Sequence, residues 1–278
     1  MSISIYVPVV NNPEFIRLQV QACKAFCKEQ FRFVVFNDAK AFPDTSNWNN
    51  AGIKQEIVDV CKELGVECIN VPNDEDMFAK SPSYRHSRTA NFMWKHYQTK
   101  EQHPVLTLDS DMFPIKSFSL FEDLVHYDFA YVEQVRGGMP FAWPNLWWMD
   151  PTKLTNHDLI DWGSDVINGD TTDTGGKSWR WFVKNDSTRV QKIKYQPSCT
   201  WNKANSTSID IPQAVLDFCE EDIKNVNNKY WCEIYENRFL HLRAGSNWEG
   251  IAKSIHTSRT LKLNKLLSEL MACENESS

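Results

Sequence analysis

Two patterns of apolar residues alternate along the first 111 residues: short continuous runs, and longer segments with apolar residues at helical spacing. Four short apolar runs are typical of buried strands: residues 2–10, 31–36, 66–71 and 104–109. Three segments repeat apolar residues at helical spacing: residues 13–29, 51–64 and 83–98. Strands that alternate with helices of this length predict an α/β fold, with a mostly parallel, Rossmann-like central sheet and helices on both of its faces.

The second half of the chain follows a less regular pattern. The expected elements are strands at 129–135 and 141–149, helices at 151–161, 212–222 and 258–272, a polar, loop-rich stretch from 163 to 208, and a frayed tail at 274–278. No repeat and no low-complexity linker interrupts the sequence. We therefore expect a single domain over residues 1–278.

The composition narrows the class of protein. A hydrophobic fraction of 42% over 278 residues is ordinary for a globular core. The net charge of −6 argues against a nucleic-acid partner and against docking to anionic lipid, since both favour basic surfaces. No apolar run reaches about 18 residues and the N-terminus lacks the features of a signal peptide, so we expect no membrane span and a cytoplasmic location. The eight cysteines include no C-x-x-C pair, which indicates reduced thiols rather than a zinc site.

The clearest chemical signal is an apolar run that begins at Val105 and ends in Asp109-Ser110-Asp111. Alternate side chains of an extended backbone share a face, so the two aspartates can point the same way. Two carboxylates at the end of a buried strand suit a hard cation, Mg²⁺ or Mn²⁺, that can bridge to a diphosphate. Solvated carboxylates at a strand end are the alternative. Asp74-Glu75-Asp76 has the same spacing, but it stands in a polar loop.

A basic helix start precedes this strand. Ser83 can cap the helix, and Arg85, His86 and Arg88 follow it closely. The first-turn amides and these cations can face an anion such as a donor phosphate. The alternative is a solvated, basic first turn.

A late segment offers a third candidate metal ligand. His241 follows the apolar Phe239-Leu240 and precedes a loop with Arg243 and Gly245. The imidazole can complete the coordination of a metal, Arg243 can reach a diphosphate, and the backbone at Gly245 can approach it closely. A structural histidine is the alternative.

Asp173 stands just before Gly175-Gly176. It either caps a turn or acts as a general base that activates an acceptor hydroxyl. The next carboxylates to consider for that role are Glu133, Glu233 and Glu236. Most of the aromatic residues around these segments should be core, with one or two against a ligand: Phe141, Trp143, Trp147, Trp148, Trp162, Trp179, Trp181 and Trp201.

Together these residues resemble the GT-A glycosyltransferases over most of the chain. The run that ends at Asp111 resembles the D-x-D strand of that family. Residues 144–149 resemble a later strand whose asparagine, here Asn145, lies near the donor sugar. Asp173 falls where related enzymes place an acidic residue near the reacting centre. The segment that begins at His241 resembles the C-terminal loop of family-8-like members, in which the histidine binds the metal.

The resemblance implies a nucleotide-binding half, residues 1–111, and an acceptor-side half, residues 112–273. It implies a metal-dependent enzyme that moves a sugar from a UDP-sugar to a hydroxyl of a glycan or glycoprotein, with inversion; UDP-xylose, UDP-glucose and UDP-galactose are candidate donors. The chain is also similar to small soluble glycosyltransferases of chloroviruses, which decorate capsid glycans. A viral origin would place it in the host cytoplasm.

This interpretation assigns roles to particular residues. The residues expected to contact the donor are Pro8, Val9, Asn11, Asn37, Asp38, Arg85, His86, Arg88, Asp109, Asn145, Arg243 and Gly245. Asp109, Asp111 and His241 are the expected ligands of Mn²⁺ or Mg²⁺. Asp173 is the expected catalytic base.

Two other functions stay open at this point. A sugar nucleotidyltransferase would also combine such a sheet with acidic metal ligands, but it would need a glycine-rich, basic N-terminal loop. Residues 6–17 contain no glycine and only one basic residue, Arg17. A non-catalytic carbohydrate- or nucleotide-binding module is the second alternative. Metal-dependent release of UDP from a sugar nucleotide would distinguish all three functions.

Overall fold

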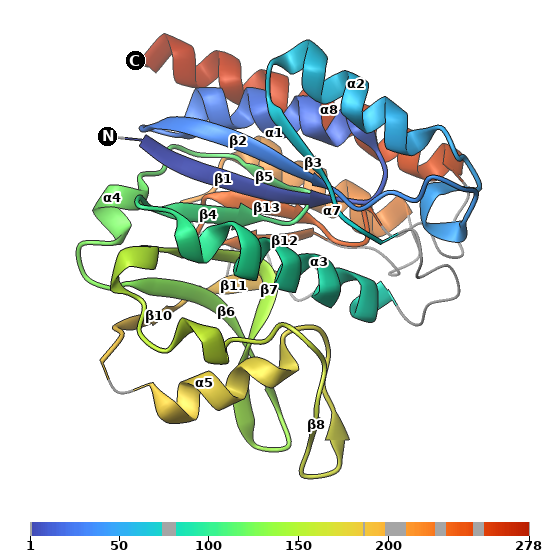
Figure 1. Ribbon diagram of the computed structural model, residues 1–278. Helices are drawn as coiled ribbons and strands as arrows, with labels where there is room; N and C mark the ends of the chain where they lie inside the picture. The colour runs from blue at the N-terminus through green and yellow to red at the C-terminus, as the bar shows by residue number, and fades with distance from the viewer. Residues whose placement is uncertain are drawn as a thin grey trace.

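A computed structural model describes residues 2–73, 82–185, 187–197, 210–225, 232–246 and 253–277. Its central sheet has seven strands in the order β10-β6-β7-β4-β1-β2-β3 (Figure 1). These strands are β1 (Ser2–Val9), β2 (Gln30–Asn37), β3 (Glu67–Asn70), β4 (Val105–Leu108), β6 (Phe129–Arg136), β7 (Met139–Met149) and β10 (Val190–Lys192). Strands β1 to β4 run parallel, and β7 runs antiparallel to both β4 and β6. The predicted α/β class with a mostly parallel sheet is confirmed.

Helices cover both faces of this sheet. One face carries α1 (Pro13–Phe26), α2 (Ile53–Leu64) and α8 (Lys253–Ser277), which lie above the sheet in Figure 1. The other face carries α3 (Pro82–His96) and α5 (Trp179–Lys184). The alternation of side chains along a strand explains the two cores, because Ile5 and Val7 of β1 pack with the first group and Tyr6 packs with the second.

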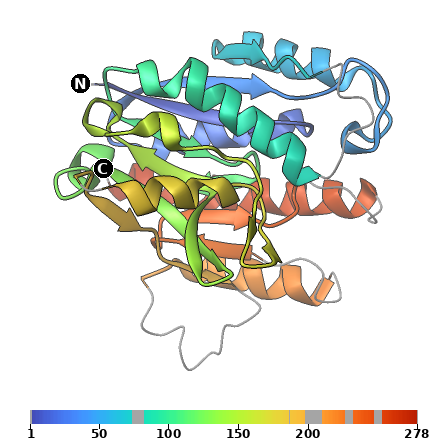
Figure 2. The ribbon, with the colours of Figure 1, turned by 60° about the horizontal axis from the view of Figure 1, so that its bottom comes forward.

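A second, smaller sheet connects distant parts of the chain. Its order is β11 (Tyr195–Pro197), β12 (Cys232–Tyr235), β13 (Phe239–Leu242) and β5 (Met112–Pro114), all antiparallel to their neighbours. Figure 2 shows the orange helix α7 (Gln213–Asn225) beside the strands of this sheet. The described part also contains the short helix α4 (Leu120–Asp123), the hairpin of β8 (Val166–Ile167) and β9 (Asp170–Thr171), and several 3₁₀ turns.

Four expected elements differ from the structure. The helix expected at 13–29 ends at Phe26, because the backbone at Cys27 is extended and forms a bridge with Phe118. The helix expected at 151–161 is wrong: this stretch holds two 3₁₀ turns, Pro151–Lys153 and His157–Leu159, and Asn156 between them has a left-handed φ of 52°. The helix expected at 258–272 is longer, because α8 covers Lys253–Ser277, and the tail expected at 274–278 is therefore wrong as far as Ser277.

The loop-rich stretch from 163 to 208 contains more structure than the sequence pattern indicates. In its described part lie α5 and the strands β8 to β11, each of two to six residues. Elements this short have too few positions to show a period. No helix among the described residues is both long and apolar enough to cross a membrane. Among the described cysteines, Cys23, Cys27, Cys61, Cys68 and Cys219 are thiols outside any disulfide.

Candidate active site

A cavity of about 530 Å³ opens at the carboxyl ends of the parallel strands. Strand β1 has β2 on one side and β4 on the other, so the chain reverses its direction across the sheet between β1 and β4. Ligands of open α/β sheets bind at such a switch point, because the loops diverge there. The cavity is lined by residues that end or follow these three strands: Pro8, Val9, Val10, Asp38, Lys40, Asp109, Ser110 and Asp111.

Asp109, Asp111 and His241 form a compact group in this cavity, named here the Asp-Asp-His cluster. Each offers one ligand atom, and the three atoms lie within 4.8 Å of one another. The distance between His241 Nε2 and Asp111 Oδ1 is 3.1 Å. Asp111 and His241 are each only 4% exposed. The structure therefore brings together the three residues that the sequence proposed as metal ligands.

Pairing between the two sheets positions this cluster. The amide of Asp109 donates to the carbonyl of Asn145 on β7 (2.9 Å), which extends the β4–β7 pairing to the first aspartate. Strand β5 begins directly after Asp111, and its Met112 is the register partner of His241 on β13. Leu242 N donates to the carbonyl of Asp111 (2.8 Å). The short strand β5 thus brings His241 beside an aspartate 130 residues earlier in the sequence.

Gly245 makes room for the second aspartate. A Cβ atom at this position would lie 2.9 Å from Asp111 Cβ and 2.8 Å from the carbonyl oxygen of Leu242, distances that would force a displacement. The next residue, Ser246, donates its amide to Asp111 Oδ2 (3.1 Å). Ala244 and Ser246 line the cavity, whereas Gly245 lies behind it, against Asp111.

The charges of the cluster influence one another strongly. Burial and the neighbouring Asp111 carboxylate raise the pKa of Asp109. Burial opposes ionisation of Asp111 as well, but His241 and backbone amides hold its pKa below the usual range. Burial alone would lower the pKa of His241, yet the carboxylates of Asp111 and Glu233 raise it to about 10. The half-buried Asp109 and the buried Asp111 therefore repel each other, and a bound cation would relieve that repulsion.

The donor set fits a divalent metal. Carboxylate oxygens suit Mg²⁺ and Mn²⁺, and an imidazole nitrogen adds a preference for a transition metal over Mg²⁺. Mn²⁺ therefore matches two carboxylates and one imidazole better than Mg²⁺ does. Asp109, Asp111 and His241 are the residues that would hold the ion.

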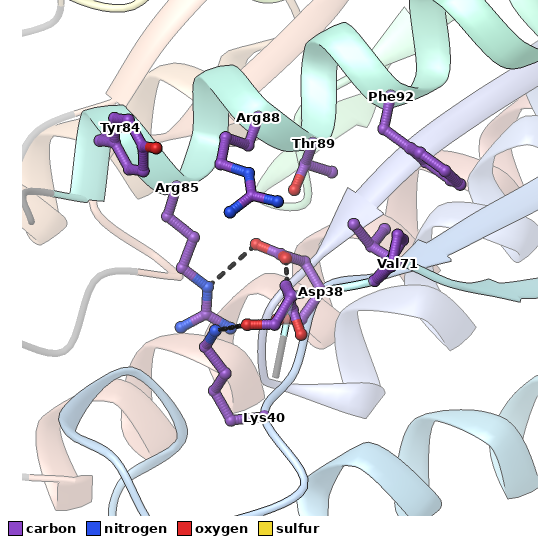
Figure 3. A pocket seen from close by; sticks show the side chains of 10 residues that line it. Asp38, Lys40, Val71, Tyr84, Arg85, Arg88, Thr89 and Phe92 are labelled. Carbon is purple, nitrogen blue, oxygen red and sulfur yellow. Dashed lines mark hydrogen bonds and ion pairs between the residues drawn. The ribbon is translucent and has the colours of Figure 1, made fainter. Parts of the chain in front are cut away.

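A second group of charges, named here the Arg85 cluster, comprises Asp38, Asp44 and Arg85. Arg85 Nε donates to Asp38 Oδ2 at 3.0 Å, and Nη1 of the same guanidinium lies 3.3 Å from Asp44 Oδ2. Burial raises the pKa of Asp38, although Arg85 and Asn73 favour its ionised form. In Figure 3, Arg85 and Arg88 extend from α3 toward Asp38. Arg88 lines a separate small cavity of about 50 Å³ beside this cluster.

Asp173 lies on a loop at the wall of the main cavity. Its Oδ1 accepts hydrogen bonds from Ser83 Oγ and from the amide of Thr174, both at 2.7 Å. The expectation that Ser83 caps the helix is wrong, because α3 begins at Pro82 and Ser83 lies within its first turn. Among the described residues, the hydrogen bonds to Asp173 engage Oδ1, which fixes the carboxylate and leaves Oδ2 for a ligand.

The structure brings ten of the proposed site residues to the wall of the main cavity and places five outside its lining. The lining residues are Pro8, Val9, Asp38, Arg85, His86, Asp109, Asp111, Asp173, His241 and Arg243. The residues outside this lining are Asn11, Asn37, Arg88, Asn145 and Gly245.

Three asparagines of this second set support the wall from behind. The Asn11 amide donates to the carbonyls of Ser46 (2.8 Å) and Ser246 (2.7 Å), so it joins two loops that line the cavity. Asn37 Nδ2 donates to the side chain of a β3 residue at 3.0 Å. Asn145 Nδ2 donates to a tyrosine hydroxyl at 2.7 Å, and Asn145 is fully buried.

Sequence reasoning missed part of the wall. The polar residues that it did not propose are Lys40, Asp44, Thr45, Ser46, Thr89, Ser110, Thr174 and Ser246. Several of them lie in the loop that follows Asp38. Ligands bind beyond the carboxyl ends of parallel strands, so this loop was a place to look for further wall residues. Trp143 is the tryptophan of the aromatic group that lines the cavity, and its ring centroid lies 6.3 Å from that of His241. Trp147, Trp148, Trp162 and Trp181 belong to the core, and Trp201 lies outside the described residues.

No protein-family model and no curated protein matches the chain. Similar solved structures include the galactosyltransferase LgtC in complex with donor and acceptor sugar analogues, at 11% identity and a TM-score of 0.45, with 97% of this chain and 96% of that chain covered. An active-site mutant of LgtC matches at 16% identity and a TM-score of 0.36, over 55% of this chain and 58% of that one. The bifunctional glycosyltransferase WbbM matches at 11% identity and a TM-score of 0.34, over 54% of this chain and 31% of that one. The chain thus spans less than two thirds of the last two structures.

Proposed function

We propose that this protein is a metal-dependent glycosyltransferase of the GT-A type that uses a UDP-sugar donor. The observation that carries the proposal is the Asp-Asp-His cluster, which lies in a large cavity at the switch point of the sheet. A nucleoside diphosphate needs both a cation for its phosphates and a cleft for its base and ribose. The cavity offers ligands for the first and about 530 Å³ for the second.

Each side of the cavity has a part in this proposal. Asp38, together with the backbone at Pro8 and Val9, would hold the nucleoside, and Arg243 would contact the diphosphate. A cation bound by Asp109, Asp111 and His241 would supply Lewis-acid stabilisation of the charge on the departing diphosphate. Asp109 could also contact the ribose.

Asp173 is proposed as the general base of an inverting transfer. Its Oδ2 would take the proton of the acceptor hydroxyl as that oxygen forms a bond to the anomeric carbon of the donor sugar. The bond from the anomeric carbon to the phosphate oxygen breaks, and its electron pair leaves with UDP. The fixed orientation of the carboxylate, through Ser83 and Thr174, supports this role.

The interpretation as a sugar nucleotidyltransferase is less well supported. Its triphosphate would need basic groups near the first loop, and the one basic residue there, Arg17, pairs with Glu14 and Glu63 on the exposed side of α1 and α2. A binding module without catalysis would not require a carboxylate held in the position of Asp173.

The test is a hydrolysis and transfer assay with UDP-xylose, UDP-glucose, UDP-galactose and GDP-mannose, each with Mn²⁺, with Mg²⁺ and with EDTA. We expect Mn²⁺-dependent release of UDP from at least one UDP-sugar, and no release with EDTA. Pyrophosphate release from UTP and a sugar phosphate would instead identify a nucleotidyltransferase. Binding of UDP with no turnover of any donor would identify a binding module.

A further inference from the structure

A buried chain of hydrogen bonds continues behind the Asp-Asp-His cluster, away from the cavity. His241 Nδ1 lies 2.9 Å from Glu233 Oε2, and the same carboxylate oxygen accepts from Tyr235 Oη at 2.6 Å. Tyr235 Oη in turn accepts from Asn145 Nδ2 at 2.7 Å. Glu233 is 5% exposed, and Tyr235 and Asn145 are fully buried.

The pairing of two short strands produces this arrangement. Glu233 on β12 and His241 on β13 are direct register partners, so their side chains lie on the same face of the antiparallel pair. Tyr235 is two residues after Glu233 on the same strand and therefore shares that face. Asn145 comes from β7 of the other sheet, and its backbone carbonyl accepts from the amide of Asp109. One asparagine thus contacts both the first aspartate of the cluster and the support of its histidine.

A buried carboxylate in this place needs an explanation. Glu233 is not among the residues that line the cavity, so it is not placed to take a proton from an acceptor. Burial opposes its ionisation, yet His241, Tyr235 and Arg243 hold its pKa below the usual range. Isolated buried carboxylates are costly, and apolar residues would pack between these strands at least as well.

We propose that Glu233 is a positioning residue for the metal site. Its carboxylate fixes the imidazole of His241 so that Nε2 faces Asp111 and the cation. Tyr235 holds the carboxylate, and Asn145 in turn holds Tyr235. A metal-binding imidazole presents one nitrogen to the ion and donates the N–H of the other, so an acceptor at Nδ1 selects the tautomer and the ring orientation. The carboxylate also makes the imidazole a stronger ligand. This inference rests on the proposed function only for the presence of a metal, and not for the donor or the reaction.

The decisive experiment is calorimetric titration of the whole protein with Mn²⁺ alone. The variants are Glu233→Gln, which keeps the size of the side chain, and Tyr235→Phe, which removes one hydroxyl. We expect Glu233→Gln to weaken Mn²⁺ binding by about 10–100-fold, the usual effect of losing a partner of a metal-binding histidine. The loss of Mn²⁺ affinity in Tyr235→Phe should lie at the lower end of that range. Excess Mn²⁺ should restore UDP release by both variants.

Two matched controls separate positioning from general damage. Glu133→Gln makes the same change on β6, where the carboxylate pairs with Lys192 near the surface. Tyr195→Phe removes the hydroxyl of a ring that stacks on Tyr235 at 5.1 Å and is 42% exposed. Both should bind Mn²⁺ as the parent does. Circular dichroism and thermal unfolding then show whether each variant is folded.

A spectroscopic readout completes the test. In protein labelled with ¹⁵N-histidine and loaded with Mg²⁺, the Nδ1 proton of His241 should appear as a downfield, slowly exchanging signal, identified by its absence in His241→Ala. Glu233→Gln should move it upfield. If the Mn²⁺ titrations of Glu233→Gln and the parent superimpose, Glu233 has no positioning role and the inference is wrong. If the parent itself binds no Mn²⁺, the metal site and this inference both fail, whereas Mn²⁺ binding without UDP release contradicts only the proposed reaction.

Discussion

The Arg85 cluster and the Asp-Asp-His cluster both hold buried carboxylates at the same edge of the sheet, but they balance their charge differently. In the Arg85 cluster, one guanidinium contacts both Asp38 and Asp44. In the Asp-Asp-His cluster, His241 contacts Asp111 and Glu233, while Asp109 faces the like charge of Asp111. In the first group, each carboxylate forms an ion pair with the same guanidinium. In the second, Asp109 has no ion pair among the described residues, which is the expected state of a site that binds a cation.

The difference indicates which contacts shape the cleft and which serve the metal. Changes in the Arg85 cluster should act mainly on folding and on the shape of the cleft. Changes in the Asp-Asp-His cluster should act mainly on metal binding and turnover. The following variants test that separation.

Asp111→Asn should have the largest effect. It preserves the size of the side chain and removes the carboxylate that faces His241 Nε2. We expect Mn²⁺ binding by calorimetry and metal-dependent UDP release both to fall below detection, with a normal circular dichroism spectrum. Near-parental UDP release at saturating Mn²⁺ would exclude Asp111 as a metal ligand.

Asp173→Asn should lower sugar transfer by about 10²–10⁴-fold, the range that general-base catalysis supplies. The affinities for UDP and Mn²⁺ should stay at the parental values, because the proposed role of Asp173 is toward the acceptor. A transfer assay beside a UDP titration separates these effects, and NMR of the anomeric proton of the product tests inversion. A parental rate of sugar transfer in the variant would show that Asp173 is not the general base.

His241→Ala should weaken Mn²⁺ binding by about 10–100-fold and lower turnover correspondingly. The loss should be partly reversed at high Mn²⁺ concentration, since two carboxylates remain. Metal titration curves that superimpose on those of the parent would show that His241 is only structural.

Gly245→Ala tests the packing behind the cluster. The added methyl group would meet Asp111 Cβ at 2.9 Å, and overpacking of this kind costs about 1–3 kcal/mol. We expect Mn²⁺ affinity to fall by about tenfold, because roughly 1.4 kcal/mol at the ligand gives that factor. The control is Gly52→Ala, whose methyl group would meet the flexible end of Asn50 at 3.1 Å. An unchanged Mn²⁺ affinity in Gly245→Ala would show that Asp111 tolerates the displacement.

Arg85→Ala should have the smallest effect on the metal and a clear effect on the fold. It leaves Asp38 buried without its cation, and breaking a buried pair costs about 3 kcal/mol or more. Urea unfolding should show this loss of stability. The Mn²⁺ affinity should stay within about twofold of the parental value, well under a tenfold change, which corresponds to about 1.4 kcal/mol. A large loss of Mn²⁺ affinity would mean that the two clusters are not independent.

The sequence predicted the first half of the molecule well because its signals are local. The apolar run into Asp109 and Asp111 shows a buried strand and its polar end within seven residues, and the parallel sheet then determines where that end lies. Continuous apolar runs indicate the buried strands, and the 3.6-residue period indicates the long helices between them. The same rule placed Asp38 at the cavity.

The support of the site could not be predicted in this way. Strand β5 has three residues and β13 has four, too few for a period, and only their pairing brings His241 beside Asp111. Glu233 drew attention as a spare carboxylate, but its place behind His241 depends on the β12–β13 register. Asn145 was expected at the donor sugar from resemblance alone, and its contact with Tyr235 was not foreseen. Whether it also contacts a donor stays a prediction.

The most direct test of the central claim is anomalous diffraction at the manganese edge from crystals of the protein grown with Mn²⁺ and UDP. The account predicts one strong peak within bonding distance of Asp109, Asp111 and His241 Nε2, with the diphosphate of UDP on its open side and Glu233 still bonded to Nδ1. A peak elsewhere, or bound UDP with no manganese between these three residues, would contradict the assignment of this site.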